Sequence, residues 1–272
     1  MRLQLKFSDV GWILLTFVSE KYVQLLQKNQ LDTFEKVWSR KVDWFEEPNE
    51  RRGGWSGVGR IMLQQEDGTE IGAYLKRQDN HCRTSWLHPI KGVPTFQREF
   101  EMMHYLEKCG VAAPEVMLFG RNPNGDLKTT LLTRELAGFK PLEELTEGLF
   151  SNARPSLSEQ RLVISAVATL AKKLHAANVQ HRSFYPKHLF VNMTDVNAIK
   201  VAVIDLEKSR INYIAVMRSL IDLAVLNRHA KHWSRSRRMY FYLQYLGMNR
   251  LTPFTKWLCR RIVKRSNRVK SK

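Results

Sequence analysis

The sequence predicts an α+β fold in two parts, a smaller N-terminal part built on antiparallel strands and a mainly helical C-terminal part. Residues 60–65 and 70–77 have strand-like composition and flank an Asp-Gly pair, which is typical of hairpin turns. From Pro141 onward, apolar residues recur at helical spacing, most clearly in 158–177. A chain of 272 residues is long enough for one large domain, or for two lobes, with a substantial core.

The net charge indicates an anionic partner. The chain carries 44 Lys and Arg against 26 Asp and Glu, which gives +18. Basic residues gather in roughly the last 45 positions, and acidic residues gather near 43–50. Nucleic acid, a phosphorylated glycolipid and an anionic membrane face all fit this charge.

The cysteines and the short apolar runs narrow the cellular setting. Cys82, Cys109 and Cys259 have no CxxC spacing, so we expect free thiols in a reducing compartment. The apolar run 11–18 is far shorter than the roughly 20 residues that span a bilayer, and no signal peptide is evident. We interpret this run as a buried strand or helix segment.

The chain divides into three predicted segments. Residues 1–50 are expected to form an N-terminal helical extension, because 22–27 and 31–38 carry apolar residues at helical spacing. Residues 51–137 form the predicted strand-rich lobe. Residues 138–272 form the predicted helical lobe, with a basic and aromatic tail.

Glycines precede the expected hairpin. Gly53, Gly54, Gly57 and Gly59 lie just before its first strand, where the lack of a Cβ lets backbone amides approach a phosphate. Their spacing does not match GxGxxG, so a flexible turn explains them equally well. Both interpretations stay open at this point.

A lysine and a glutamate follow in the same lobe. Lys76 ends the second hairpin strand, and Glu99 lies on an expected helix over 95–109. Glu101 is the alternative acidic residue on that helix. The helix has one apolar face, formed by Phe96, Phe100, Met103 and Leu106.

The most informative stretch runs from 181 to 210. Two apolar strands, 189–191 and 201–204, are joined by a polar turn, and Asp205 ends the second. A carboxylate at the end of a buried strand loses solvation unless a cation or a hydrogen-bond donor meets it. His181-Arg182-Ser183 and His188 precede the first strand.

This layout resembles the catalytic loop and metal-binding loop of the protein kinase-like superfamily, in which HRDLxxxxN is followed by a short hairpin and DFG. The segments YPKH and IDLEK are most similar to the lipopolysaccharide kinase family of InaA type. The resemblance covers roughly Gly53 to Asn227. It implies a bilobal protein kinase-like fold, with a small antiparallel-sheet N-lobe and a mainly helical C-lobe.

The resemblance also implies an activity and a set of sites. The activity is ATP-dependent phosphoryl transfer to a sugar hydroxyl of the lipopolysaccharide inner core, in the cytoplasm, at the inner face of the membrane. The cofactors are ATP and Mg²⁺, with Mn²⁺ as an alternative because one ligand is an imidazole. The implied site residues are Gly53, Gly54, Gly57, Lys76, Glu99 and Glu135 for the nucleotide, His188 and Asp205 for the metal, and His181, Arg182 and Ser183 around the acceptor.

Ser183 departs from the family pattern, because an Asp normally stands there as the general base. A serine hydroxyl holds its proton too tightly for that role. The enzyme could rely on positioning and charge, or Asp195 or His181 could substitute. Alternatively the chain is a pseudokinase that binds nucleotide, phospholipid or glycolipid without turnover.

Two further groups have predicted roles outside the chemistry. Asp222 lies in an apolar helical run, so we expect a buried carboxylate that accepts hydrogen bonds from the 181–183 backbone. His175 is expected to be a packing residue. The tail, 231–245 and 257–272, mixes cations and aromatics, which suits lipid headgroups and, more weakly, nucleic acid, for which no recognition motif is present.

Overall fold

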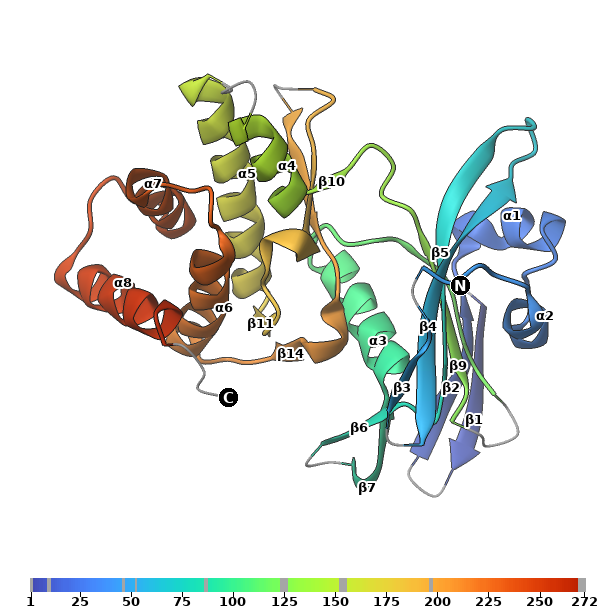
Figure 1. The fold of residues 1–272 in the computed structure, drawn as a ribbon. Coiled ribbons are helices and arrows are strands. Elements are labelled where there is room, and N and C mark those ends of the chain that lie inside the picture. The colour runs from blue at the N-terminus through green and yellow to red at the C-terminus, as the bar shows by residue number, and fades with distance from the viewer. Residues whose placement is uncertain are drawn as a thin grey trace. The chain divides into compact units, whose positions relative to one another are not determined.

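The computed structural model describes residues 2–8, 11–45, 47–51, 53–85, 88–122, 127–151, 156–195 and 198–268. The chain divides into two compact units (Figure 1). The first, here the sheet unit, comprises residues up to His104 together with Pro114–Ala137. The second, here the helical unit, comprises Tyr105–Ala113 and Gly138–Lys272.

The sheet unit is built on a seven-stranded antiparallel sheet with the order β1-β2-β8-β9-β5-β4-β3. Its strands are β1 (Arg2–Ser8), β2 (Gly11–Val18), β3 (Asn49–Arg51), β4 (Gly54–Gln64), β5 (Glu70–Asp79), β8 (Val116–Arg121) and β9 (Thr129–Arg134). A separate ribbon pairs β6 (Cys82–Ser85) with β7 (His88–Pro94). The predicted hairpin is confirmed as β4–β5, and Gly68 supplies the positive φ of its turn.

The N-terminal fifty residues are not a separate helical extension, which corrects that expectation. The apolar run 11–18 is strand β2, which pairs with β8 in the middle of the chain. The two predicted helices are present as α1 (Val23–Lys28) and α2 (Phe34–Ser39), after a short 3₁₀ turn, η1 (Glu20–Tyr22). They contribute buried residues to the same hydrophobic core as β4 and β5, because their short apolar faces have no other surface to cover them.

Helix α3 (Thr95–Lys108) follows the ribbon. Its predicted apolar face is confirmed, since Phe96, Phe100, Met103 and Leu106 are all buried. The helix is followed by Gly110 in a left-handed conformation, which lets the chain turn towards β8.

Five helices and several short strands make up most of the helical unit (Figure 1). The helices are α4 (Leu142–Ser151), α5 (Leu157–Ala176), α6 (Ala215–His229), α7 (Arg235–Leu246) and α8 (Pro253–Ser266). The strands are β10 (Lys140–Pro141), β11 (Val179–Gln180), β12 (Leu189–Asn192), β13 (Lys200–Val203) and β14 (Arg210–Ile211), with 3₁₀ turns η2 (Pro186–His188) and η4 (Leu206–Lys208). The predicted strand pair around the polar turn is therefore confirmed as β12–β13.

The helical spacing in 158–177 is confirmed as α5, whose buried face runs through Val163, Val167, Leu170 and Leu174, whereas Leu162 is 43% exposed. Most aromatic residues of the basic tail are also buried, because α7 packs against α5 and turns its rings inward. These buried aromatics are Trp233, Phe241, Tyr242 and Tyr245. Among the described residues, no helix combines the length and the apolar character that crossing a membrane requires.

Candidate functional site

An ion pair joins two of the predicted nucleotide residues in the sheet unit. Lys76 Nζ on β5 lies 2.6 Å from Glu99 Oε1 on α3. The side chains are 17% and 3% exposed, respectively. A carboxylate as buried as Glu99 needs a cation to offset its lost solvation, and Lys76 provides it. The ammonium keeps some solvent access, so it can also meet a phosphate.

The glycines have structural partners. Gly53 has a φ of 74° in the turn between β3 and β4. Gly54 and Gly57 were expected before the first hairpin strand, but they lie within that strand, β4. A Cβ on Gly54 would lie 2.4 Å from the Asn80 backbone, and one on Gly57 would lie 2.9 Å from the Trp44 ring. These close approaches account for both strand glycines without a bound phosphate.

Glu135 is engaged in a similar way. Its carboxylate accepts two hydrogen bonds from Arg60, at 2.9 and 2.8 Å. Its backbone N–H donates to the Gly72 carbonyl at 2.9 Å, and the Arg134 N–H donates to the Glu115 carbonyl at 2.9 Å. The backbone donors of Arg134 and Glu135 are thus already bonded to the protein.

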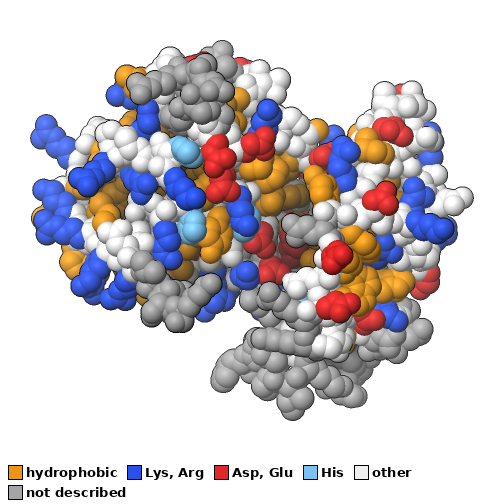
Figure 2. All heavy atoms as spheres, in the orientation of Figure 1, with side chains coloured by type: hydrophobic (Ala, Val, Ile, Leu, Met, Phe, Trp, Pro, Cys, Tyr) orange, Lys and Arg blue, Asp and Glu red, His pale blue; other side chains and the backbone are white. Residues whose placement is uncertain are grey.

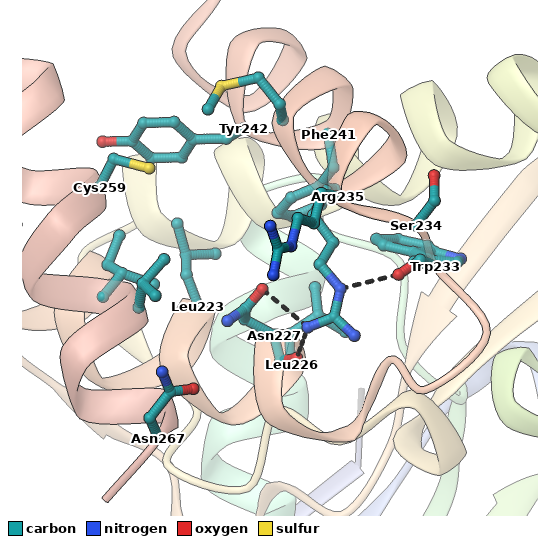
Figure 3. Close-up of a pocket in the computed structure, with 14 residues that line it drawn as sticks. Leu223, Leu226, Asn227, Trp233, Ser234, Arg235, Phe241, Tyr242, Cys259 and Asn267 are labelled. Carbon is teal, nitrogen blue, oxygen red and sulfur yellow. Dashed lines mark hydrogen bonds between the residues drawn. The ribbon is translucent and has the colours of Figure 1, made fainter.

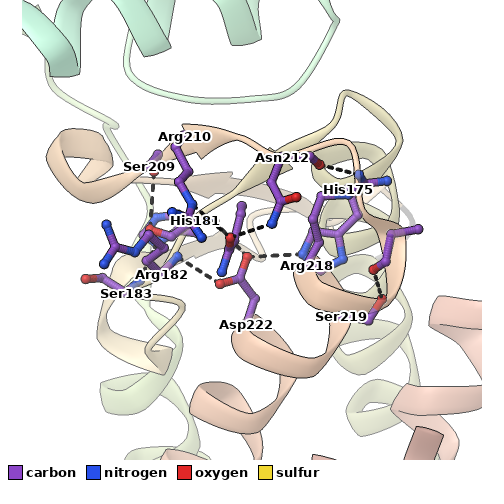
Figure 4. A network of polar contacts seen from close by, with 12 residues as sticks. His175, His181, Arg182, Ser183, Ser209, Arg210, Asn212, Arg218, Ser219 and Asp222 are labelled. Atoms are coloured by element: carbon purple, nitrogen blue, oxygen red, sulfur yellow. Dashed lines mark hydrogen bonds and ion pairs between the residues drawn. The ribbon is translucent and has the colours of Figure 1, made fainter. Parts of the chain in front are cut away.

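In the helical unit, Asp222 fixes the loop that resembles a kinase catalytic loop (Figure 4). Its carboxylate is fully buried on α6 and accepts the N–H groups of His181 at 2.7 Å and Arg182 at 2.8 Å. His175 Nε2 lies 3.2 Å from the same carboxylate. Arg182 has a φ of 67°, a strained conformation for a side chain with a Cβ, and this contact holds it. The role predicted for Asp222 is confirmed, and His175 is buried as predicted.

His181 is a structural member of the loop. Its Nδ1 accepts the Ser183 N–H at 3.2 Å, and its Nε2 donates to the Ile204 carbonyl at 2.9 Å. Burial lowers the pKa of the imidazole, which is neutral in this arrangement. With both ring nitrogens bonded to the backbone, His181 is not available as the substitute base.

His188 and Asp205, the two predicted metal ligands, lie side by side. His188 Nδ1 donates to the Ser183 carbonyl at 2.8 Å and lies 3.2 Å from Asp205 Oδ2. Burial is the main cause that lowers the pKa of His188, to about 4, so the ring is neutral near pH 7. Because Nδ1 is bonded to the Ser183 carbonyl, Nε2 is the ring nitrogen with which His188 could bind a metal.

Asp205 fits a magnesium ion better than His188 does. It lies two residues after the end of β13 and has a φ of 59°, another strained conformation at this site. Mg²⁺ is usually held by one or two carboxylates, with water and substrate phosphates completing the shell. The described residues contain no group of three or more His, Cys, Asp or Glu that would form an all-protein metal site.

The helical unit contains a polar hollow of about 520 Å³ beside the 181–183 loop and the two predicted metal ligands. Ser183, His188 and Asp205 line it, together with Lys187 and Lys208. Neither lysine has a role predicted from the sequence, although both lie inside the segments YPKH and IDLEK. Two carboxylates, Asp205 and Glu143, and two ammonium groups therefore line the hollow with Ser183, and the ammonium groups suit a phosphorylated ligand.

A larger, apolar cavity of about 700 Å³ lies among α6, α7 and α8 (Figure 3). Leu223, Phe241 and Ile262 are among its lining residues, and none of the predicted site residues lines it. Arg238 also borders it, but its guanidinium donates to backbone carbonyls of Trp233 at 2.8 Å and Ala230 at 2.7 Å. That charge is therefore structural.

Comparisons with known proteins agree with this geometry. The sequence model of the "Lipopolysaccharide kinase (Kdo/WaaP) family" matches residues 35–245. Protein InaA of Escherichia coli K12 is 34% identical over 183 residues, which cover 66% of this chain and 79% of InaA. The lipopolysaccharide core heptose(I) kinase WaaP of Escherichia coli is 26% identical over 187 residues, which cover 66% of this chain and 67% of WaaP.

A solved structure supports the fold. WaaP in complex with acyl carrier protein aligns with a TM-score of 0.64 and 21% identity, covering 92% of this chain and 98% of that one. The architecture is accordingly protein kinase-like, with the strand-rich and helical lobes that the motifs predicted. Family match, relatives and fold agree, and the chain belongs to the lipopolysaccharide kinase (Kdo/WaaP) family.

Proposed function

We propose that this protein transfers the γ-phosphoryl group of ATP to a sugar hydroxyl of the lipopolysaccharide inner core. The observation that carries the proposal is the ion pair between Lys76 and Glu99, since a strand lysine held by a buried helix glutamate is the phosphate-binding arrangement of kinases. Membership of a lipopolysaccharide kinase family supports the sugar acceptor. Kinases of this kind use ATP and a divalent metal.

In this proposal each site residue has a separate role. Lys76 holds nucleotide phosphate oxygens, and Glu99 fixes its direction. Asp205 would hold Mg²⁺, which would supply positive charge to offset that of the phosphoryl group. Neutral His188 anchors the Ser183 carbonyl through Nδ1, and so sets the loop beside Asp205. In this proposal Gly53, Gly54, Gly57 and Glu135 shape the sheet unit and make no direct contact with the nucleotide.

Ser183 changes how the acceptor is activated. Asp195 is a poor substitute base, because it lies in the exposed turn after β12, at the far end of the β12–β13 hairpin from Asp205. We propose that the loop 181–183 positions the acceptor hydroxyl and that charge stabilisation does the rest. Phosphoryl transfer has a loose transition state that needs little help from a base.

The acceptor is proposed to be anionic. Lys187 and Lys208 line the hollow that contains Ser183, and their ammonium groups suit a phosphate or carboxylate beside the reacting hydroxyl. A phosphorylated glycolipid satisfies this chemistry. We therefore propose that the protein acts in the cytoplasm, at the inner face of the cytoplasmic membrane.

A second candidate is a pseudokinase that binds lipid or nucleotide without turnover. Two observations favour it. Ser183 replaces the base, and the apolar cavity among α6, α7 and α8 has room for an acyl chain. In this case Lys76 and Asp205 would still bind nucleotide.

One experiment separates these functions. The protein is incubated with radiolabelled ATP, Mg²⁺ and dephosphorylated lipopolysaccharide core, and label transfer is measured for wild type, Lys76→Met and Asp205→Ala. Transfer that both variants lose supports the kinase. Absence of transfer, with an ATP- and Mg²⁺-dependent rise in the unfolding temperature that both variants lose, supports the pseudokinase. Absence of both effects contradicts the kinase and a nucleotide-binding pseudokinase alike.

A further inference from the structure

The positive charge of this protein is concentrated at one end of the sequence. No Asp or Glu follows Asp222, whereas 14 of the 44 Lys and Arg lie in 223–272. The preceding residues carry the other 30 basic residues against all 26 acidic ones, a net of only +4. Fourteen of the eighteen net charges therefore belong to the last part of the helical unit, and Figure 2 shows Lys and Arg side chains gathered around α7 and α8.

Helix α8 is firmly docked on the unit. Thr255, Leu258, Ile262 and Ser266 form its buried face. Arg228 of α6 caps its C-terminal end by donating to the carbonyls of Ser266 at 2.8 Å, Arg265 at 2.9 Å and Arg268 at 3.0 Å. The opposite face is thus presented to solvent by a fixed helix.

That exposed face carries two large aromatic side chains. Phe254 is 57% exposed and Trp257 is 46% exposed, although most other aromatics of the tail are buried. Their rings stack with centroids 5.8 Å apart. The guanidinium of Arg261 lies 5.6 Å from the Trp257 ring, one turn further along the helix. The exposure of both rings to water is unfavourable, and contact with another apolar or interfacial surface would remove that cost.

Cations surround the aromatic pair. Lys256, Arg260, Lys264 and Arg265 are all exposed on α8, and the helix contains no acidic residue. A helix with buried apolar contacts on one side, and exposed aromatics framed by Lys and Arg on the other, matches the chemistry of an anionic lipid surface. The rings enter the interfacial region, and the cations meet lipid phosphates.

We propose that the exposed face of α8, defined by Phe254, Trp257, Arg261 and Lys264, docks the protein on an anionic phospholipid bilayer. Charge complementarity selects an anionic partner, and the exposed, stacked rings suit the interfacial region of a bilayer. The inference deepens the proposed function by naming the element that would bring the enzyme to a membrane-embedded acceptor. Its readout is binding, which does not depend on phosphoryl transfer.

The test is co-sedimentation with vesicles of phosphatidylcholine alone and of phosphatidylcholine mixed with phosphatidylglycerol. Wild type is expected to bind the mixed vesicles at least roughly tenfold more tightly, since each cation near an anionic surface contributes about 1 kcal/mol. The variants Phe254→Ser with Trp257→Ser, and Arg261→Gln with Lys264→Gln, should each weaken binding by roughly tenfold. Equal unfolding temperatures, and an unchanged ATP-dependent shift if wild type shows one, establish that these variants remain folded.

The matched control removes the same charge elsewhere in the helical unit. Lys173→Gln with Lys200→Gln alters two exposed lysines outside α8, and binding should change by less than about twofold. Brominated lipids should quench wild-type tryptophan fluorescence more than that of Trp257→Phe. An equal loss in the control, equal binding to neutral vesicles, equal quenching, or tighter binding to single-stranded RNA than to anionic vesicles would each overturn the proposal, whatever the catalytic activity.

Discussion

The carboxylate of Asp222 accepts two successive backbone N–H groups, with Oδ2 2.7 Å from the His181 nitrogen and Oδ1 2.8 Å from the Arg182 nitrogen. One side chain of α6 thereby fixes the turn that carries Ser183. The left-handed backbone of Arg182 persists because this contact, together with the hydrogen bonds of His181, leaves the loop no relaxed alternative of equal energy.

Replacing Asp222 by Asn should destabilise the protein by roughly 2–4 kcal/mol. An amide offers only one oxygen, so one of the two N–H groups would face an NH₂ group in a fully buried position. Urea denaturation measures the loss. Asp43→Asn, at an exposed carboxylate, is the matched control and should stay within about 0.5 kcal/mol of wild type. Equal effects at the two positions would contradict this role.

The pair of Lys76 and Glu99 predicts a separation of stability from nucleotide binding. Lys76→Met leaves the Glu99 carboxylate buried without a cation and should cost roughly 3–5 kcal/mol. Lys76→Met combined with Glu99→Leu should recover most of that stability. Neither variant should show the thermal shift with ATP and Mg²⁺ that wild type is expected to show.

The half-exposed pair of Arg60 and Glu135 is the comparison for this prediction. Arg60→Met should cost less than about 1 kcal/mol, because this pair keeps contact with water. Its variants should retain the nucleotide-dependent shift. A double variant at Lys76 and Glu99 that still binds ATP as wild type does would remove these two residues from the nucleotide site.

Ser183 offers a gain-of-function test. Ser183→Ala should change the rate of phosphoryl transfer by less than about threefold, since the hydroxyl does not act as a base. Ser183→Asp should raise the rate by less than about tenfold, because the loose transition state gains little from an added base. The assay is radiolabel transfer at saturating ATP, with Ser158→Asp on the exposed start of α5 as the control. A large loss in Ser183→Ala would instead show that the hydroxyl takes part.

Local patterns and ordered motifs predicted the central elements well. The hairpin β4–β5 and helix α3 follow from turn chemistry and helical periodicity, which depend on neighbours in the sequence. The contacts of Lys76 with Glu99, and of Asp222 with the loop, followed from motif order, because a shared fold brings these distant positions together.

Contacts between residues far apart in the chain could not be predicted from the sequence. Strand β2 pairs with β8, about a hundred residues away, so nothing near 11–18 indicated which sheet it joins. The sequence allowed Gly57 to belong to a phosphate-binding loop or to a turn. It did not predict the close approach of the Trp44 ring that accounts for this glycine. The role of His188 depended on a proton position, which the Ser183 carbonyl sets and residue type alone cannot reveal.

His181 predicts how stability depends on pH. Burial lowers its pKa below the ordinary value of 6.5, so between these two pKa values the unfolded chain binds a proton that the native protein does not. The contribution of neutral His181 to the free energy of unfolding is therefore fully present above about pH 6.5, and it is lost as the pH drops below that value. Protonation would also place a hydrogen on Nδ1, directly against the Ser183 N–H, and so loosen the loop.

Urea denaturation across this pH range should show the decline for wild type and a shallower one for His181→Gln. The glutamine can keep a donor near the Ile204 carbonyl but does not titrate. His232→Gln, at a partly exposed histidine, should leave the wild-type slope unchanged. If His181→Gln kept the full decline, the acid sensitivity would have to come from other buried groups, of which His188 is the next to test, because burial lowers its pKa to about 4.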